Sequence, residues 1–519
     1  MNLRDLIVRR QIDWYRIVCY LMIMSETASA PASDRIPRRV WIISGVAMLG
    51  AVMSILDTTI VNVALATLGK ELHASLATTQ WVVTGYMLAL AAVIPITGWA
   101  SRRFGAKRVF LISLTLFTLG SLLCGLATTS TELILFRVLQ GMGGGMIMPL
   151  AQMIMADAAG PKRMGRVMGL VAVPMMLAPT LGPLLGGVII ESLSWHWIFY
   201  VNIIVGAVAI PLAIRLLPTT VGQKTDPLDV LGLVLMSGGL VAITYGLAEA
   251  GDYGSFTNAH VWGPIVFGVT LVAAFVVHAL RIEQPLLDLH LYRRRHFSAA
   301  SIVMFTLGAA VFGAMILMPL YWQELRGFSV IETGLLTGPQ GLGMAIAMPV
   351  AARMTERYGG GPVALVGVLV TAVMTIPFAL IGAHTGIAWL CVVMVLRGVG
   401  MGASFMPAMT AAFAALDRSE VSHATPQLNV LNRVGGSLGT TVLAVVLATG
   451  LRHAHTEAAA AQAYGTAFWW SVAMALAAVV PCIVLMRAES SARKAAREAG
   501  RDDPERVALA SGAVAEAVV

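Results

Sequence analysis

Roughly fourteen apolar runs, each about twenty residues long, most constrain what this chain can fold into. A helix of about twenty residues spans the hydrocarbon core of a bilayer, where only helices and closed barrels satisfy every backbone polar group. The 519 residues are 58% hydrophobic and only 12% charged, with a mean hydropathy of +0.80. These values lie far from those of soluble domains. The sequence therefore predicts an all-α polytopic membrane protein with fourteen spans, which begin near Trp41, Thr78, Val109, Glu132, Val167, Ile198, Leu228, Val261, Phe297, Thr333, Pro362, Ile387, Gln427 and Thr466.

The basic residues lie mainly in alternate short loops. With the N-terminus inside, sixteen Lys and Arg side chains fall in the cytoplasmic loops and three in the outward loops. Positive residues accumulate on the cytoplasmic side, so we predict a cytoplasmic (inner) membrane protein with both termini cytoplasmic. The net charge of +8 then needs no nucleic-acid partner. The four cysteines have no CxxC spacing, and the sequence predicts no metal site, disulfide framework or cofactor.

Short motifs recur eight spans apart, and transporters can be built from parallel repeats of this kind. The matched sets are Arg103-Phe104-Gly105 with Arg357-Tyr358-Gly359; Arg137, Gly141 and Gly145 with Arg397, Gly398 and Gly402; and Gly182 and Gly186 with Gly435 and Gly439. We predict cytoplasmic tails at 1–40 and 488–519, six-helix halves at 41–217 and 281–487, and a two-helix insert at 218–280. Within the N-terminal tail, Met22 and Met24 are alternative translation starts.

One carboxylate lies inside an apolar run. Asp57 follows Trp41 by sixteen residues, or about 24 Å from the inner surface, and Arg137 lies about 8 Å from the outer surface. In a core about 30 Å thick these depths nearly coincide, so an Asp57–Arg137 pair is geometrically possible, and each residue needs a charge partner in this medium. An intramembrane carboxylate is a candidate functional site because its burial is costly. The alternatives are an Asp57 with a capping or structural role, and an Arg137 that ties its helix to neighbouring carbonyl groups.

Four stretches, taken together, are specific enough to indicate a family. They are 56–64 in the first span, 98–108 in the following loop, 135–143 in the fourth span and 178–187 in the fifth, and 195–202 fits the same pattern. They resemble the fourteen-helix drug:proton antiporter branch of the major facilitator superfamily, the EmrB/QacA type, and the resemblance extends from Trp41 to Arg487. It implies a major facilitator fold and proton-driven efflux of small lipophilic or amphipathic compounds by alternating access. In a cell with two membranes it also implies a periplasmic adaptor and an outer-membrane channel as partners.

The chemistry of the pair predicts how coupling would work. Burial disfavours the charged form of a carboxyl group, whereas a nearby guanidinium favours it. We predict that Asp57 takes a proton from outside and releases it inside, and that this proton competes with the substrate, directly or through Arg137.

Two glycine-containing motifs are predicted to control the conformational change. The loop motif comprises Gly98, Arg102, Arg103, Gly105, Lys107 and Arg108, with Arg102 where the wider superfamily has an acidic residue. Asp157 is a possible partner of Arg103 in a cytoplasmic latch; the alternative is a solvated loop that only sets topology. The exporter-helix motif comprises Pro179, Gly182, Pro183, Gly186 and Gly187 and predicts a hinge or, alternatively, an ordinary small-residue packing face.

The substrate is less constrained by the sequence. Asn62, Trp81, Tyr86 and Gln140 are candidates to line the substrate cavity. Few acids lie within the spans, which favours neutral, monocationic or amphipathic compounds. A dedicated exporter of an endogenous metabolite, siderophore or fatty acid shares these motifs, and a proton-coupled importer is a further alternative. No HExxH, GxSxG or GxxxxGK[ST] motif is present, so the sequence does not predict an enzyme.

Overall fold

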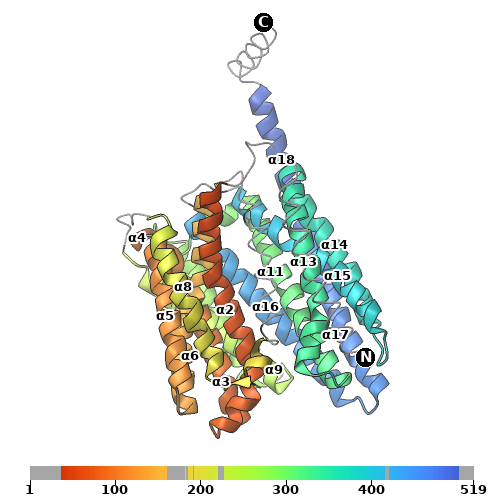
Figure 1. Ribbon diagram of the computed structural model, residues 1–519. Helices are drawn as coiled ribbons and strands as arrows, with labels where there is room; N and C mark the ends of the chain where they lie inside the picture. The colour runs from red at the N-terminus through yellow and green to blue at the C-terminus, as the bar shows by residue number, and fades with distance from the viewer. Residues whose placement is uncertain are drawn as a thin grey trace.

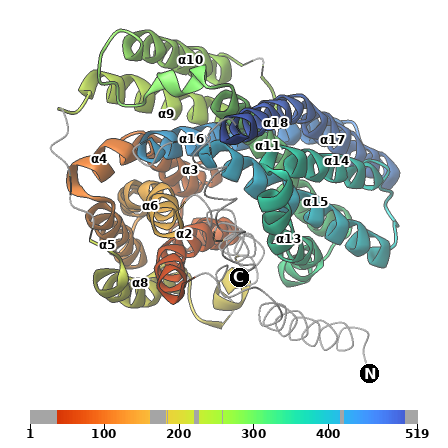
Figure 2. The same cartoon turned by 90° about the horizontal axis from the view of Figure 1, so that it is seen from above.

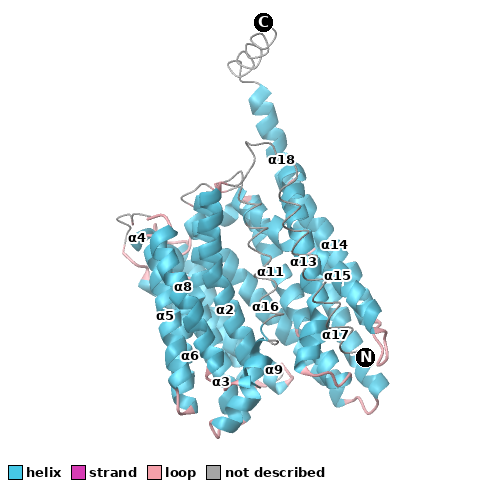
Figure 3. Cartoon of the chain, in the orientation of Figure 1, coloured by secondary structure: helices cyan, strands magenta, loops and turns pink. Residues whose placement is uncertain are grey.

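The structure is a computed structural model, and the residues that it describes are almost entirely helical (Figure 3). It describes residues 37–160, 167, 182, 185–190, 192–219, 222, 227–256, 258–414, 416 and 420–501. Across these residues there is no β-strand. Twelve helices are long and apolar enough to cross a membrane, or thirteen if α3 and α4, which meet at an angle of 56°, form one broken span. The predicted all-α membrane fold is confirmed. The predicted fifth span lies mostly outside the described residues.

The helices follow the predicted order of spans. Before residue 217 these are α2 (Arg38–Glu71), α3 (Leu76–Val93), α4 (Thr97–Phe104), α5 (Ala106–Leu126), α6 (Ser130–Ala159) and α8 (Trp197–Leu216). The next pair is α9 (Val230–Tyr253) and α10 (Ala259–Ala279). The rest are η2 (Leu289–Arg293), α11 (Arg295–Met315), α12 (Leu317–Leu320), η3 (Tyr321–Leu325), α13 (Val330–Tyr358), α14 (Gly360–Ala379), α15 (Ile387–Ala414), α16 (Val421–Arg452), α17 (Glu457–Ala477) and α18 (Val479–Arg501).

Local sequence signals explain where several helices begin and end. Thr129 and Glu132 form a capping box at the start of α6, in which each side chain accepts a hydrogen bond from the other residue's backbone N–H. Gly105 separates α4 from α5 at φ +87°, and Gly359 separates α13 from α14 at φ +102°. Only glycine adopts these backbone angles without strain. The repeated Arg-aromatic-Gly motif therefore ends a helix at the same kind of sharp corner in both repeats.

Two bundles lie side by side, with α2–α8 in one and α11–α18 in the other (Figures 1 and 2). The pair α9 and α10 pack on each other at the periphery, where α9 also contacts α3 and α16 (Figure 2). Helix α18 projects beyond the bundle at the end where α2 begins (Figure 1), and we call this the tail end. The sequence-based orientation predicts that the tail end is cytoplasmic.

The two ends of the molecule differ in how the bundles meet. At the tail end, one continuous apolar core combines residues of both bundles, for example Met153 of α6 and Met409 of α15. At the opposite end, the N-terminal bundle has a core around Ile198 and the C-terminal bundle has a separate core around Trp322. The bundles are therefore packed together at the tail end and have separate cores at the other. This is the asymmetry expected of one state of an alternating-access transporter.

Candidate functional site

Asp57 lies at the centre of a buried polar cluster formed by several helices. Its Oδ2 accepts a hydrogen bond from Arg137 NH1 at 2.6 Å, and both side chains are fully buried. Its Oδ1 accepts hydrogen bonds from Gln140 Nε2 at 2.9 Å and Asn202 Nδ2 at 2.7 Å. Arg137 also donates to Gln140 Oε1 at 2.8 Å and, through Nε, to the carbonyl oxygen of Val82 at 3.1 Å. The predicted Asp57–Arg137 pair is thus present, and α2, α3, α6 and α8 all contribute to it.

A second layer holds this cluster in place. The Tyr86 ring lies 3.9 Å below the guanidinium carbon of Arg137, a cation–π contact, and its hydroxyl lies 3.3 Å from Ser54 Oγ. Asn202 also donates to Ser121 Oγ at 3.0 Å. Arg137 NH2 is buried and has no hydrogen-bond partner. The cluster satisfies the ionised carboxylate fully but leaves one donor group of the arginine unused.

Glycines on α5 and α6 allow these helices to approach closely enough. A Cβ at Gly120 would overlap the backbone of Gln140, and a Cβ at Gly143 would overlap the backbone of Phe117. The absence of side chains at these contacts brings Ser121 of α5 next to the cluster. The glycine-rich run of α6 is a packing surface, as the sequence indicates.

Two of the four predicted cavity residues belong to the cluster and two do not. Tyr86 and Gln140 contact Arg137 directly. Asn62 follows Asp57 by five residues, or about 140° around α2, and is exposed. Trp81 is 41% exposed and stacks on Tyr245 of α9, with ring centroids 5.9 Å apart. Neither Asn62 nor Trp81 has a hydrogen bond with a described member of the cluster, and their role as cavity residues stays a prediction.

The sequence analysis missed Asn202 and Ser121 as site residues. Asn202 is an amide inside the apolar helix α8, where a polar side chain needs a partner. That signal was available in the sequence. Its partner was not, because α2 and α8 are brought together only by the fold.

The equivalent arginine of the second repeat has a different environment. Arg397 of α15 is 1% exposed and donates to Thr375 Oγ1 at 3.0 Å and Gln340 Oε1 at 2.8 Å. Its NH2 group has no partner. Among the described residues, no carboxylate forms an ion pair with it. The two repeats share the buried arginine but not the acid.

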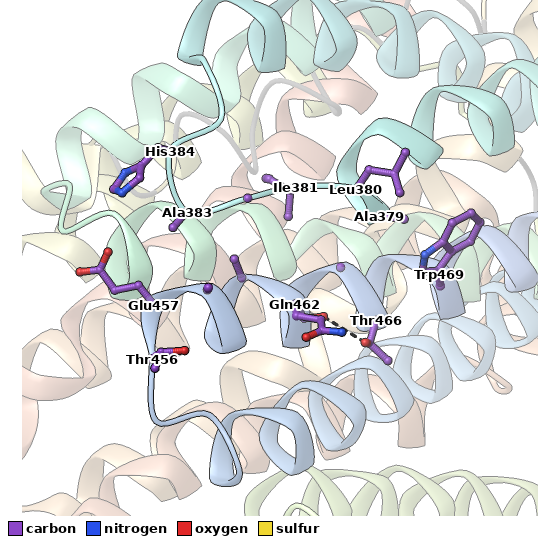
Figure 4. Close-up of a pocket in the computed structure, with 14 residues that line it drawn as sticks. Ala379, Leu380, Ile381, Ala383, His384, Thr456, Glu457, Gln462, Thr466 and Trp469 are labelled. Atoms are coloured by element: carbon purple, nitrogen blue, oxygen red, sulfur yellow. Dashed lines mark hydrogen bonds between the residues drawn. The ribbon is translucent and has the colours of Figure 1, made fainter.

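A separate hollow of about 800 Å³ opens between the C-terminal end of α14 and the N-terminal end of α17 (Figure 4). Its lining includes His384, Glu457, Gln462 and Trp469. None of the residues of the Asp57 cluster borders it. We therefore do not assign the coupling chemistry to this hollow.

Comparison with known proteins identifies the family. The family model described as "Major Facilitator Superfamily" matches residues 47–440. The chain belongs to the Major Facilitator Superfamily. It is therefore a multi-pass membrane transporter of small molecules and not an enzyme.

Similar superfamily members include proteins named for drug resistance. The chain is 40% identical to the "Multidrug resistance protein B homolog" of Mycobacterium tuberculosis, over 80% of this chain and 78% of that protein. It is 29% identical to the "Multidrug export protein EmrB" of Haemophilus influenzae, over 76% and 78%. These matches confirm the drug:proton antiporter branch as the resemblance that the motifs indicate.

Solved structures show the same fold at low sequence identity. The human organic anion transporter MFSD10 (TETRAN) has a TM-score of 0.61 at 16% identity, covering 87% of this chain and all of that one. The proton:xylose symporter XylE has a TM-score of 0.56 at 14% identity, covering 85% and 96%. At these identities the comparison concerns the fold alone.

The loop motif of this superfamily member lies at the tail end, between the two bundles. A Cβ at Gly98 of α4 would overlap the carbonyl oxygen of Ser422 in α16. Lys107 Nζ donates to the carbonyl oxygens of Ile214 and Leu217 at 2.7 and 2.8 Å, at the C-terminal end of α8. A cation is favourable there because the last carbonyl groups of a helix carry partial negative charge. Arg102 is half-buried, whereas Arg103, Arg108 and Asp157 are exposed. The Arg103–Asp157 latch stays a prediction.

The exporter-helix motif is only partly described. Pro179 and Pro183 lie outside the described residues, and Gly187 is buried. Cβ atoms at Gly182 and Gly186 would meet Thr59 and Ile60 of α2. In the second repeat, Cβ atoms at Gly435 and Gly439 would overlap the backbone of α11. The matched glycines therefore all lie at close helix contacts. Arg357, from the repeated loop motif, lies 5.2 Å from the ring centre of its neighbour Tyr358.

Proposed function

We propose that this transporter exports small lipophilic or amphipathic compounds in exchange for protons, with Asp57 as the proton carrier. The observation that carries the proposal is the fully buried ion pair between Asp57 and Arg137. A carboxylate at this depth is costly unless it is paired, and in transporters such residues form proton relays. The drug-resistance names of the relatives support the choice of cargo.

Protonation of Asp57 would change the contacts that hold α2 against α6 and α8. When Asp57 is ionised, Arg137, Gln140 and Asn202 satisfy its two oxygens. A proton on Asp57 removes the charge that holds Arg137 NH1, and the same arginine already has one donor without a partner. The guanidinium then favours any arrangement that supplies another acceptor. Protonation therefore biases the position of α2 against α6 and α8.

The packing of the bundles supports the direction of transport. The shared core closes the tail end, while the two bundles have separate cores at the other end. With the tail end cytoplasmic, as the loop charges predict, this arrangement corresponds to the outward-facing state of the transport cycle. Substrate leaves and a proton enters in this state. The proton is released after the bundles rock and Asp57 pairs again with Arg137.

The test is gradient-driven efflux of lipophilic dyes and antibiotics from cells that lack their own pumps. Asp57→Asn keeps the shape of the side chain and removes the titratable group. We expect loss of efflux, by at least about 100-fold, with an unchanged elution profile of the purified protein. Glu420→Gln is the matched control, because it removes an acid that pairs with Arg294 at the surface, and its efflux should remain near the native rate.

Collapse of the proton gradient should abolish native efflux in the same assay. Full efflux by Asp57→Asn would contradict the assignment of the proton carrier. Absence of efflux for every compound by well-expressed native protein would instead favour a dedicated metabolite exporter or an importer.

A further inference from the structure

Three arginines lie well inside the described spans, away from the helix ends, and they differ in what balances their charge. Arg137 has a carboxylate, and Arg397 is buried against two neutral acceptors. Arg433 has neither. It is exposed, and its NH1 group lies 4.0 Å from the thioether sulfur of Met87. A guanidinium inside a span that has no anion and remains accessible requires a separate explanation.

Arg433 lies at mid-membrane depth on the boundary between the bundles. It is twelve residues, or about 18 Å, from the start of α16. Its contact Met87 is on α3 of the other bundle. One turn earlier, Asn429 donates to Gln152 of α6 at 2.7 Å, and Val430 packs in a core with Ala91 of α3. This face of α16 therefore meets the N-terminal bundle, so the guanidinium is directed toward that bundle and not toward lipid.

The local balance of charge is positive. Asp57 is the one carboxylate deep within a described span, and Arg137, Gln140 and Asn202 already occupy both of its oxygens. The other acids of the described spans lie near helix ends, as do Glu132 and Glu249. No described ion pair includes Arg433. A cation in this position is best balanced by a charge that arrives with the cargo.

We propose that Arg433 binds an anionic group of the transported compound, a carboxylate or sulfonate, so that amphipathic organic anions are a substrate class of this exporter. A guanidinium presents paired N–H donors that match the two oxygens of such a group. Met87 beside it offers a flexible, polarisable surface for the apolar body of the same molecule. This inference rests on the proposed export function and extends it to anionic cargo, whereas the sequence favours neutral, monocationic or amphipathic compounds.

Charge movement is consistent with this substrate class. Export of an anion moves negative charge out of the cell, and entry of a proton moves positive charge into it. The inside-negative membrane potential therefore assists both steps. The substrate anion and Asp57 need not share an atom, because Arg137 holds Asp57 and Arg433 is a second cation on another helix.

The test compares two probes that differ in one charged group. 1-Anilinonaphthalene-8-sulfonate carries a sulfonate, and N-phenyl-1-naphthylamine has the same ring system without it. Binding of each is titrated by fluorescence on the full-length protein in zwitterionic nanodiscs, with empty nanodiscs as the blank. Arg433→Gln should weaken sulfonate binding at least about tenfold and leave binding of the neutral probe within about twofold, because one charge-assisted contact is lost.

Two further variants separate binding from structure. Arg433→Lys keeps the charge but not the paired donors, and its sulfonate affinity should fall between those of the native protein and Arg433→Gln. It also provides the test if Arg433→Gln does not fold. Arg281→Gln removes one positive charge from the exposed segment after α10 and should bind both probes as the native protein does.

The inference is overturned if the native protein does not bind the sulfonate, if Arg433→Gln leaves its affinity within about twofold, or if both probes weaken alike. Ethidium efflux by native protein and by Asp57→Asn is measured in parallel. If ethidium efflux is normal and depends on Asp57, any of these three results contradicts the anion site at Arg433 but leaves the proposed export function in place. Absence of efflux for every compound tested, by well-expressed native protein, contradicts the exporter instead, while the binding titration still reports on Arg433.

Discussion

The two repeats place an arginine at equivalent positions and stabilise it differently. Arg137 in the first repeat pairs with Asp57 and lies on the Tyr86 ring. Arg397 in the second donates to Thr375 and Gln340, which cannot carry a negative charge at neutral pH. Both arginines are almost completely buried, and both leave NH2 without a partner. Both repeats therefore bury an arginine at this position, but among the described residues only the first supplies it with a titratable partner.

This difference indicates where a proton can act. A neutral network has the same charge in every state of the transport cycle. An ion pair can be broken by one proton, and the cost of leaving the other charge buried then drives a rearrangement. The N-terminal bundle is accordingly the one expected to sense the proton gradient, and the second arginine is not expected to take part in proton coupling.

The difference between the two repeats is tested most directly by replacing each arginine in turn. Arg137→Met leaves the Asp57 carboxylate buried without a cation and should lower the free energy of unfolding by about 3–5 kcal/mol. Arg397→Met replaces an unbalanced charge with an apolar chain of similar length, so unfolding should change by less than about 1 kcal/mol and efflux should persist. Denaturant unfolding in detergent and dye efflux measure the two effects. Equal losses in both variants would show that the repeats are not functionally distinct.

A smaller effect is expected from the neutral partners. Asn202→Ala removes a hydrogen bond to a charged carboxylate, which contributes about 1.5–3 kcal/mol, and should slow efflux about tenfold. Thr375→Ala removes a hydrogen bond to Arg397 and should affect only the unfolding free energy, by a similar amount. Efflux rates and unfolding curves of the Asn202→Ala and Thr375→Ala variants measure these effects. Slow efflux by Thr375→Ala would assign a transport role to the second repeat.

The smallest effect concerns the two glycine corners. Gly105→Ala and Gly359→Ala each force a side chain into an extended, positive-φ backbone conformation that is nearly restricted to glycine, at about 1–3 kcal/mol. A Cβ at Gly359 would also displace the Glu489 carboxylate, which accepts hydrogen bonds from the Gly360 and Gly361 backbone N–H groups. Gly359→Ala should therefore be the less stable variant in thermal melting of the purified proteins. The reverse order would mean that the Gly105 corner carries more of the packing.

Much of the candidate site follows from the sequence because charge is so costly inside a membrane. The similar depths of Asp57 and Arg137, and the need of each for a charge partner, indicate the pair, and the structure places Arg137 NH1 2.6 Å from Asp57 Oδ2. Gln140, one turn from Arg137, is singled out as well. Asn202 is not, since an uncharged amide in an apolar helix is a weaker signal. Trp81 is chosen as a cavity residue but stacks on α9, because spacing along one helix does not specify which neighbour each face meets.

The sequence by itself determined the helical membrane fold, the order of the spans and the residues whose burial needs compensation. These properties follow from the bilayer, which requires each span to be apolar and about twenty residues long and makes every exception costly. Only the tertiary structure decided that Asn202 and Ser121 complete the Asp57 cluster, that Arg397 has neutral partners, and that Arg433 remains accessible between the bundles. These outcomes depend on which helix faces meet, and that is set by close packing between residues distant in the chain.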